Sequence, residues 1–187
     1  MLDVERTALA GLLILTPRRF GDARGFFAET WNAARLAEVA GIDPFFVQDN
    51  HSLSADVNTI RGLHYQAPPH GQGKLVRCGR GALWDVAVDI RRGSPTYGSW
   101  VGVDLTAENG KQVWVPEGFA HGFVTRATDT EIVYKCTCYY APEAEGVVRW
   151  DTVGIDWGLT GDPILSDKDA VAPALAEVDS PFEWSKA

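Results

Sequence analysis

Hydrophobic and polar positions alternate along most of the chain after residue 44. In residues 81–90 a hydrophobic side chain occupies every even position, whereas both aspartates of the stretch fall at odd positions. A period of two is typical of a β-strand with two different faces. Residues 101–105 repeat this alternation, Asn109-Gly110 predicts a tight hairpin turn, and residues 112–116 predict the returning strand.

Further strands and one helix complete the pattern. Residues 121–126 and 130–140 predict a second pair of strands joined by a short turn. The stretch 31–40 is rich in Ala, Leu and Glu, and it predicts a helix that Thr30 could cap and Gly41 would end. Strands at this regular spacing, with Gly and Pro between them, predict a sandwich or a barrel.

The two ends of the chain are less regular. The apolar run 8–15 predicts a buried first strand that ends at Thr16-Pro17. The run has the length of a signal-peptide core, but acidic residues precede it where basic ones are expected. Residues after Trp157 have weak periodicity and are expected to wrap around the strands in loops and short helical turns. We expect one domain over residues 1–187.

Composition narrows the class of ligand and the compartment. The chain has 187 residues, a formal net charge of −8 and a pI of about 4.9. Its surface as a whole should therefore repel nucleic acid and anionic membranes, and an anionic ligand would need a local basic pocket. The three cysteines are odd in number and show no disulfide pattern, which favours a reducing cytoplasm.

A first candidate site centres on His64. On a strand Gly62, His64 and Gln66 share one face. Gly62 would leave space beside the imidazole for a ligand, and Arg61 and Lys74 add positive charge nearby. The alternative interpretation is a core histidine with one hydrogen-bond partner, beside solvated cations.

A second candidate site centres on His121. The spacing Pro-x-Gly-x-x-His in residues 116–121 resembles the second motif of the cupin superfamily, where metal cupins use this histidine as a ligand. Their first motif needs His-x-His and a following Glu. Here the equivalent stretch is His64-Tyr65-Gln66, and no Glu precedes Lys74. A stable metal site needs three or four convergent ligands, so we expect no bound metal.

Two further patterns each allow a structural and a functional interpretation. Tyr134, Cys136, Cys138 and Tyr140 share one parity on the predicted strand. The cysteines would pack as small apolar groups, whereas the tyrosines could be core aromatics, or an acid and a stacking platform. Asp169 could lie in an exposed polar turn or fold back to orient a histidine. Spacing alone does not choose between these interpretations.

Taken in series, these stretches resemble the dTDP-4-dehydrorhamnose 3,5-epimerase family. They run in order and without large gaps, and they are residues 20–31, 48–52, 61–66, 72–77, 85–91, 94–96, 116–123, 134–135 and 140–142, Glu145 with Trp150, and residues 166–169. The resemblance implies a mainly β fold, a cupin-like jelly-roll β-barrel with a short N-terminal helix and a C-terminal wrap. It also implies a homodimer, because some nucleotide contacts in the family cross a dimer interface.

The resemblance implies a role for each site residue. His64 would be the general base, oriented by Asp169, and Tyr134 the opposing general acid. Lys74 would lie near the C4 oxygen of the substrate, and Tyr140 would stack on the thymine ring. The remaining substrate contacts would be Arg24, Glu29, Gln48, Asn50, Arg61, His121, Glu145 and Lys168.

The implied reaction converts dTDP-4-dehydro-6-deoxy-D-glucose to dTDP-4-dehydro-L-rhamnose by epimerisation at C3 and C5, without metal or cofactor. Protons on both carbons are α to the C4 ketone, so one base can serve both centres and one cation can stabilise the enolate. Inversion needs a proton from the opposite face, hence a second group such as Tyr134. Arg24, Arg61 and Lys168 would meet the pyrophosphate.

Three alternatives stay open from the sequence. A relative that epimerises only C3 or only C5 would carry the same acid and base. A metal-dependent cupin oxygenase would need a third and a fourth ligand. A non-catalytic sugar-nucleotide-binding module would have no need for a paired acid and base.

Overall fold

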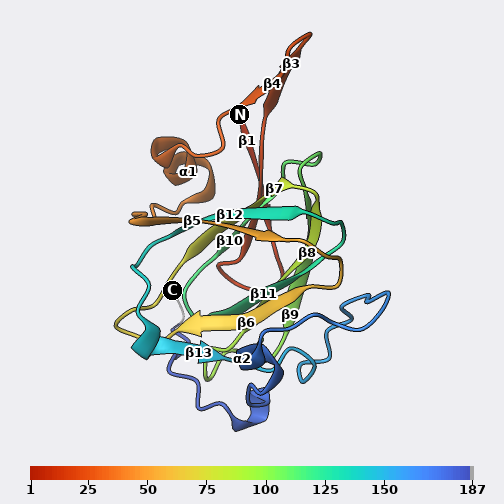
Figure 1. Cartoon of the computed structure of the whole chain (residues 1–187). Helices are drawn as coiled ribbons and strands as arrows, with labels where there is room; N and C mark the ends of the chain where they lie inside the picture. Colours follow the sequence, from red (N-terminus) through yellow and green to blue (C-terminus); the bar gives the residue numbers. More distant parts are fainter. Residues whose placement is uncertain (186–187) are drawn as a thin grey trace.

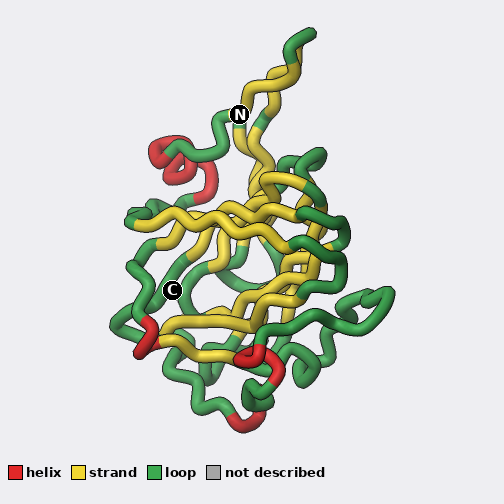
Figure 2. Tube along the Cα trace, in the orientation of Figure 1, coloured by secondary structure: helices red, strands yellow, loops and turns green. Residues whose placement is uncertain are grey.

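Two antiparallel sheets face each other in the computed structural model, which describes residues 1–185 (Figure 1). The larger sheet has the order β1-β2-β10-β7-β12-β5, with strands Leu2–Arg6 (β1), Leu13–Pro17 (β2), Gln112–Val115 (β10), Lys74–Arg80 (β7), Thr130–Cys136 (β12) and Gln48–Ser54 (β5). The smaller has the order β13-β6-β11-β8-β9, with strands Glu145–Val147 (β13), Ile60–Gln66 (β6), Phe119–Thr125 (β11), Ala82–Asp89 (β8) and Trp100–Thr106 (β9). Figure 2 shows these two stacks of strands, with loops gathered at their rims.

The order of the strands is that of a jelly roll. Between β5 and β12 the chain crosses from one sheet to the other at every connection except β8 to β9, which are neighbours. The predicted fold class, a cupin-like jelly roll, is therefore confirmed. The predicted strand pairs are wrong, because β9 and β10 lie in different sheets, as do β11 and β12. The turn at Asn109-Gly110 is tight, with Gly110 at φ +63°, but it carries the chain between the sheets.

Three hydrophobic clusters hold the layers together. Between the sheets, Ile14, Val76 and Leu83 belong to one cluster. The outer face of the larger sheet packs on helix α1 (Ala33–Ala40) through Leu36 and Ala40. The outer face of the smaller sheet is covered by C-terminal residues that include Trp157 and Phe182, as the predicted wrap requires. Other short elements of the wrap and rim are η1 (Pro142–Ala144), α2 (Asp167–Ala170) and η2 (Leu175–Glu177).

The N-terminal region differs from prediction in its boundaries. Residues 8–12 form a turn, and the first buried strand begins at Leu13. The helix begins at Ala33, and its N-cap is Asn32, whose side chain accepts a hydrogen bond from the Arg35 N–H at 3.0 Å. Thr30, the predicted cap, instead uses its carbonyl to accept a hydrogen bond from Gln112 Nε2 at 2.9 Å. The helix ends at Gly41 as predicted.

Strands β3 (Arg19–Asp22) and β4 (Gly25–Ala28) form a separate two-stranded arm. The arm projects from the barrel on the side away from α2 (Figure 1). Its large apolar side chains stay in contact with solvent, since Phe26 and Phe27 are 61% and 69% exposed. Within residues 1–185, no helix is long and apolar enough to cross a membrane.

Candidate active site

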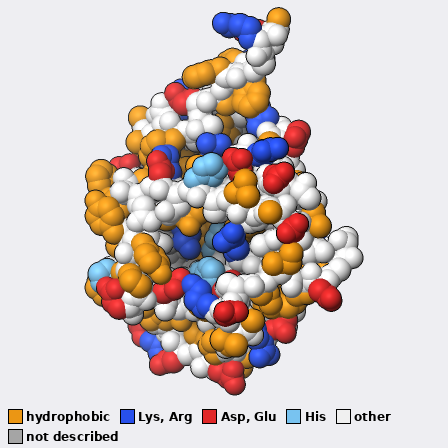
Figure 3. Space-filling model, viewed as in Figure 1, with side chains coloured by type: hydrophobic (Ala, Val, Ile, Leu, Met, Phe, Trp, Pro, Cys, Tyr) orange, Lys and Arg blue, Asp and Glu red, His pale blue; other side chains and the backbone are white. Residues whose placement is uncertain are grey.

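A cavity of about 610 Å³ is lined by residues of both sheets and reaches the hydrophobic cluster at Phe123 and Ile132. Figure 3 shows Lys, Arg and His side chains gathered around a hollow on this face of an otherwise mixed surface. This is the local basic pocket that an anionic ligand of an acidic protein requires. Of the predicted site residues, those that line it are Arg61, His64, Lys74, His121, Tyr134, Lys168 and Asp169.

His64 and Asp169 are in direct contact, although 105 residues separate them. His64 Nε2 lies 2.7 Å from Asp169 Oδ1, and the second carboxylate oxygen accepts a hydrogen bond from the Gly62 N–H at 3.4 Å. Asp169 belongs to α2, which Ser166 caps by accepting from the Asp169 N–H. The expected contact between this aspartate and a histidine is therefore present.

The negative charge of Asp169 determines which nitrogen of the His64 ring carries the hydrogen of their contact. Burial acts to raise the pKa of this carboxyl, but hydrogen bonds from His64 and from the Gly62 backbone bring it below its usual value. Asp169 is therefore a carboxylate near neutral pH, and a carboxylate can only accept. His64 Nε2 thus carries the hydrogen of the contact, and in the neutral ring Nδ1 is the nitrogen with a lone pair.

An irregularity in β6 brings Arg61 and His64 into the same cavity despite their odd spacing. Arg61 pairs with Phe123 and His64 with His121, so two residues of β6 oppose one of β11. Gly62, with φ +135°, lies within this bulge, and a Cβ there would come 2.5 Å from Gly122 Cα. The prediction that Gly62 makes room beside the imidazole is wrong, because the glycine permits close approach of two strands.

Tyr134 and Lys74 come from the opposite sheet, on β12 and β7. Burial raises the pKa of the Tyr134 phenol, an effect that Cys136 increases and the Arg61 guanidinium opposes. The phenol therefore holds its proton near neutral pH. Burial lowers the pKa of the Lys74 ammonium, while Cys136, Asp85 and Glu145 counteract the lowering. No carboxylate of residues 1–185 lies within 4.0 Å of this ammonium.

Asp85 is a site residue that the sequence reasoning missed. Its two carboxylate oxygens lie 3.0 and 2.9 Å from His121 Nε2, and both side chains are buried. Asp85 comes from β8, directly beside β11 in the smaller sheet. The available signal was the odd parity of the two aspartates in residues 81–90, which marks the face of β8 that points between the sheets.

A second opening of about 240 Å³ adjoins the first and shares His64, Lys74 and Tyr134 with it. It holds the predicted residues Gln48, Asn50, Tyr140 and Glu145. Strand β12 ends at Cys136, so Tyr140 lies on the following loop and not on the predicted longer strand. Its side chain is 55% exposed. At the rim, Glu145 Oε1 accepts from Lys168 Nζ at 2.7 Å.

Comparison with known proteins places the chain in a family. A sequence profile described as dTDP-4-dehydrorhamnose 3,5-epimerase matches residues 6–177. The dTDP-4-dehydrorhamnose 3,5-epimerase of Salmonella typhimurium is 53% identical over 177 residues, which covers 94% of this chain and 96% of that protein. The chain belongs to the dTDP-4-dehydrorhamnose 3,5-epimerase family.

Solved structures of this family have the same fold. An epimerase of Legionella pneumophila, solved in complex with dTDP-4-keto-L-rhamnose, superposes with a TM-score of 0.95 at 45% identity, covering 100% of both chains. A 3'-monoepimerase of Streptomyces bikiniensis, solved with dTDP-quinovose, gives 0.86 at 35% identity, covering 91% of this chain and 86% of the other. The family fold is therefore shared by enzymes named for two centres and for one.

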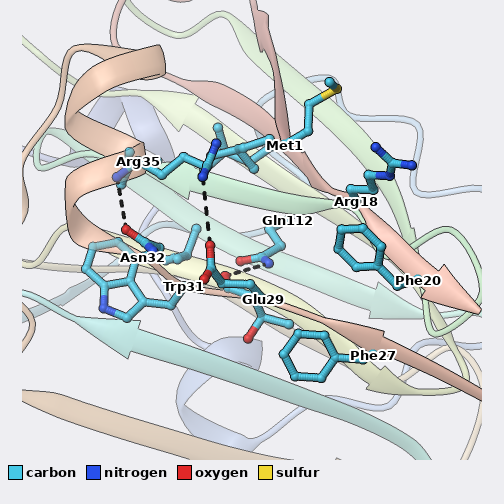
Figure 4. A pocket seen from close by; sticks show the side chains of 14 residues that line it. Met1, Arg18, Phe20, Phe27, Glu29, Trp31, Asn32, Arg35 and Gln112 are labelled. Carbon is cyan, nitrogen blue, oxygen red and sulfur yellow. Dashed lines mark hydrogen bonds and ion pairs between the residues drawn. The ribbon is translucent and has the colours of Figure 1, made fainter.

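Two predicted substrate contacts of this epimerase-family chain lie outside its cavity. Arg24 is at the tip of the arm, where its side chain is 90% exposed and its Nη2 lies 2.5 Å from Asp22 Oδ2. Glu29 lines a separate cavity of about 210 Å³ between the arm and α1, where Arg35 Nε approaches it to 3.9 Å (Figure 4). The structure brings the other predicted site residues together, but not these two.

The histidines outside the cavity have ordinary surroundings. His51 lies 3.0 Å from Glu131 on the surface, and His70 is a partly exposed loop residue. In the part of the chain that the structure describes, no group of three or more His, Cys, Asp and Glu side chains is arranged to hold a metal ion. Cys136 and Cys138 are free, as is Cys78.

Proposed function

We propose that this protein epimerises dTDP-4-dehydro-6-deoxy-D-glucose at C3 and C5 to give dTDP-4-dehydro-L-rhamnose. The observation that carries the proposal is one cavity with a carboxylate-bound histidine on one sheet and a protonated tyrosine on the facing sheet. Two-sided proton transfer is what inversion at a carbon requires. The relatives named for this reaction are similar over nearly the whole chain.

In this mechanism His64 Nδ1 removes the proton from C5 or C3 while Asp169 stabilises the resulting imidazolium. The electron pair of the broken C–H bond moves into the C4 carbonyl, giving an enolate whose oxygen is stabilised by the Lys74 ammonium. Tyr134 then donates its proton to the carbon from the opposite face. Each inversion leaves His64 protonated and Tyr134 deprotonated, so both exchange a proton with water before the second inversion.

No step of this mechanism oxidises or reduces the substrate, so the reaction needs no redox cofactor. The Lys74 ammonium takes the role that a metal ion has in other enolising enzymes. Arg61 and Lys168 supply positive charge for the pyrophosphate, and Tyr140 supplies a stacking surface for thymine. These roles are assigned by fitting the chemical groups of the proposed substrate to the side chains around the two openings.

We further propose that the protein works as a homodimer in the cytoplasm, each chain a single domain. Arg24 and the exposed phenylalanines of the arm support a partner copy, because they lie far from the polar cavity of their own chain. An arm that docks on a second copy would bury Phe26 and Phe27 and carry Arg24 to the other cavity. The free cysteines agree with a reducing compartment.

A second candidate function is epimerisation at a single centre. It is the less favoured alternative, because a relative named for two centres is 53% identical and the 3'-monoepimerase is 35% identical. The protein is incubated in heavy water with dTDP-4-dehydro-6-deoxy-D-glucose, and nuclear magnetic resonance records deuterium and configuration at C3 and C5. Deuterium and inversion at both carbons are expected. Exchange at one carbon alone would select the single-centre enzyme, and binding without exchange would contradict catalysis altogether.

A further inference from the structure

Side-chain amides replace strand partners where the chain leaves β12. Residues 137–141 follow the end of the strand at Cys136, and Tyr140 among them lines the second opening. The Tyr140 N–H donates to Gln48 Oε1 at 2.9 Å, and the Ala141 N–H donates to Gln66 Oε1 at 2.9 Å. Gln66 Nε2 donates to the Tyr139 carbonyl at 3.2 Å. The backbone is thus held immediately before, at and after Tyr140.

Gln66 makes most of these bonds from a buried position. It is 4% exposed, and its Nε2 also donates to the His70 carbonyl at 2.7 Å. Both N–H groups and the oxygen of one amide are therefore used, which is the full donor capacity of the side chain. Gln66 stands at the end of β6, two residues after His64. The strand that carries the histidine also fixes the loop that carries Tyr140.

The ring of Tyr140 contrasts with its backbone. It is 55% exposed, and its hydroxyl makes one long contact, 3.4 Å from Glu145 Oε2. A fixed backbone under an open ring lowers the entropy lost when a flat ligand stacks on that ring. Preorganisation of this kind acts on binding of the base, and it leaves the proton-transfer groups untouched.

We propose that Gln66 is a positioning residue for nucleobase recognition, acting through the main chain of Tyr140. The inference rests on the proposed function in taking a thymidine nucleotide as the ligand and Tyr140 as the residue that stacks on its base. Removing the amide frees residues 139–141 to adopt other conformations, so the base loses its platform. Gln66 touches neither the sugar nor the reacting carbons in this assignment, and its loss raises KM more than it lowers kcat.

The test is a double-mutant cycle on dTDP binding, measured by calorimetry with the full-length protein. Tyr140→Ala is expected to weaken binding about 10-fold, as loss of one base–aromatic stack does. Gln66→Met, which keeps the length of the side chain, should weaken it by a similar factor. In the Tyr140→Ala background Gln66→Met should add less than about 2-fold, because the platform is already gone. Deoxyribose 5-diphosphate, which lacks the base, should bind all four proteins alike.

Each contrary result has one meaning. If the two substitutions add fully, or if binding of the base-free ligand falls equally, Gln66 supports the barrel end generally and the proposal is wrong. If kcat falls while KM is unchanged, Gln66 acts on His64 along β6 and the proposal is also wrong. If Gln66→Met does not fold, the cycle is decided with Gln66→Glu, which keeps the acceptor but sets a carboxylate against two carbonyls. Failure of the wild-type protein to bind dTDP would contradict the proposed function instead.

Discussion

His64 and His121 face each other as direct partners on neighbouring strands, and each holds a buried carboxylate through Nε2. The carboxylates arrive from different directions. Asp169 comes from α2 outside the barrel, and Asp85 comes from the adjacent strand β8. The cavity therefore has two histidine–carboxylate pairs side by side. The histidine of one pair, His64, is assigned as the base, and His121 of the other pair lines the same cavity.

The Asp85→Asn variant should shift the pH dependence of turnover. Asp85 counteracts the lowering of the Lys74 pKa by burial, so its removal lowers that pKa further. The ammonium is needed at the enolate, and it is lost as pH rises through its pKa. The alkaline limb of the kcat profile should therefore move to lower pH. The other titratable and charged groups around Lys74 are Arg61, His64, His121, Tyr134, Cys136, Glu145, Lys168 and Asp169.

A substitution at Glu145 provides a second, independent test of this prediction. Glu145→Gln removes the other carboxylate that raises the Lys74 pKa, and it should move the alkaline limb in the same direction. An alkaline limb that stays in place in both variants would mean that Lys74 does not set it. Circular dichroism at each pH separates the shift from unfolding, since Asp85 is buried and its loss also weakens the fold.

The His64→Asn variant should lose turnover while still binding dTDP. Removal of a general base typically costs about 10²–10⁴-fold, and here the same base serves two inversions. Binding should persist because the variant keeps Tyr140 at the second opening and Arg61 and Lys168 in the cavity, the predicted contacts of the thymine and the pyrophosphate. Steady-state rates and calorimetry measure the two effects. A variant that keeps more than a tenth of the wild-type rate, a loss under about 1.4 kcal/mol, would remove His64 from the role of base.

The Tyr134→Phe variant should separate proton exchange from inversion. The base and Lys74 stay intact, so the α-protons still leave, but the enolate has no acid on its far face. The imidazolium of His64 then returns a proton to the original face. In heavy water the variant should incorporate deuterium with retention faster than it forms epimerised product. Equal loss of exchange and inversion would show that water or another residue is the acid.

Activity should survive prolonged treatment with a chelator. The motivation is the absence of a His-x-His and Glu set in the sequence together with Lys74 in the lining of the cavity. The rate is compared before and after dialysis against the chelator, with metal content measured on the same samples. Loss of activity that a divalent ion restores would contradict the assignment of Lys74 to the enolate oxygen.

Two inactive variants should complement each other if the arm serves the partner copy. Arg24→Ala removes the arm cation, and His64→Asn removes the base. After the two proteins are unfolded and refolded together, mixed dimers contain one cavity with both groups intact. With random pairing the mixture should regain about a quarter of the wild-type rate at low substrate concentration. A mixture no more active than the average of its components would place Arg24 outside the partner's site.

The positions of the strands could be predicted from the sequence better than the pairing of strands within the sheets. Periodicity located β8 and β9 because hydrophobic and polar residues alternate along both. It could not show that Asn109-Gly110 joins two sheets, since that depends on which distant strands compete for the same edge. The cap was misplaced because Thr30 and Asn32 are both suitable residues, and a tertiary contact from Gln112 decides between them.

The candidate site was predictable only in part from local pattern. His64 and His121 stood out by their neighbours, but Asp169 gained a role only through resemblance to a family, since spacing carries no information across 105 residues. Asp85 was overlooked because an aspartate on an alternating strand is more often a solvated residue. Its burial follows from the second sheet, which no local pattern reveals.

The position of α2 outside the jelly roll means that the proton-transfer groups and the carboxylate that orients one of them are encoded by separate parts of the gene. The strands supply the imidazole, the phenol and the ammonium, whereas the carboxylate that gives the imidazole its direction is supplied by a four-residue helix in the C-terminal wrap. Substitutions in that wrap can alter turnover without changing any strand of the jelly roll. Divergence within this architecture can therefore change the orienting carboxylate through the wrap while the strands keep the imidazole, the phenol and the lysine.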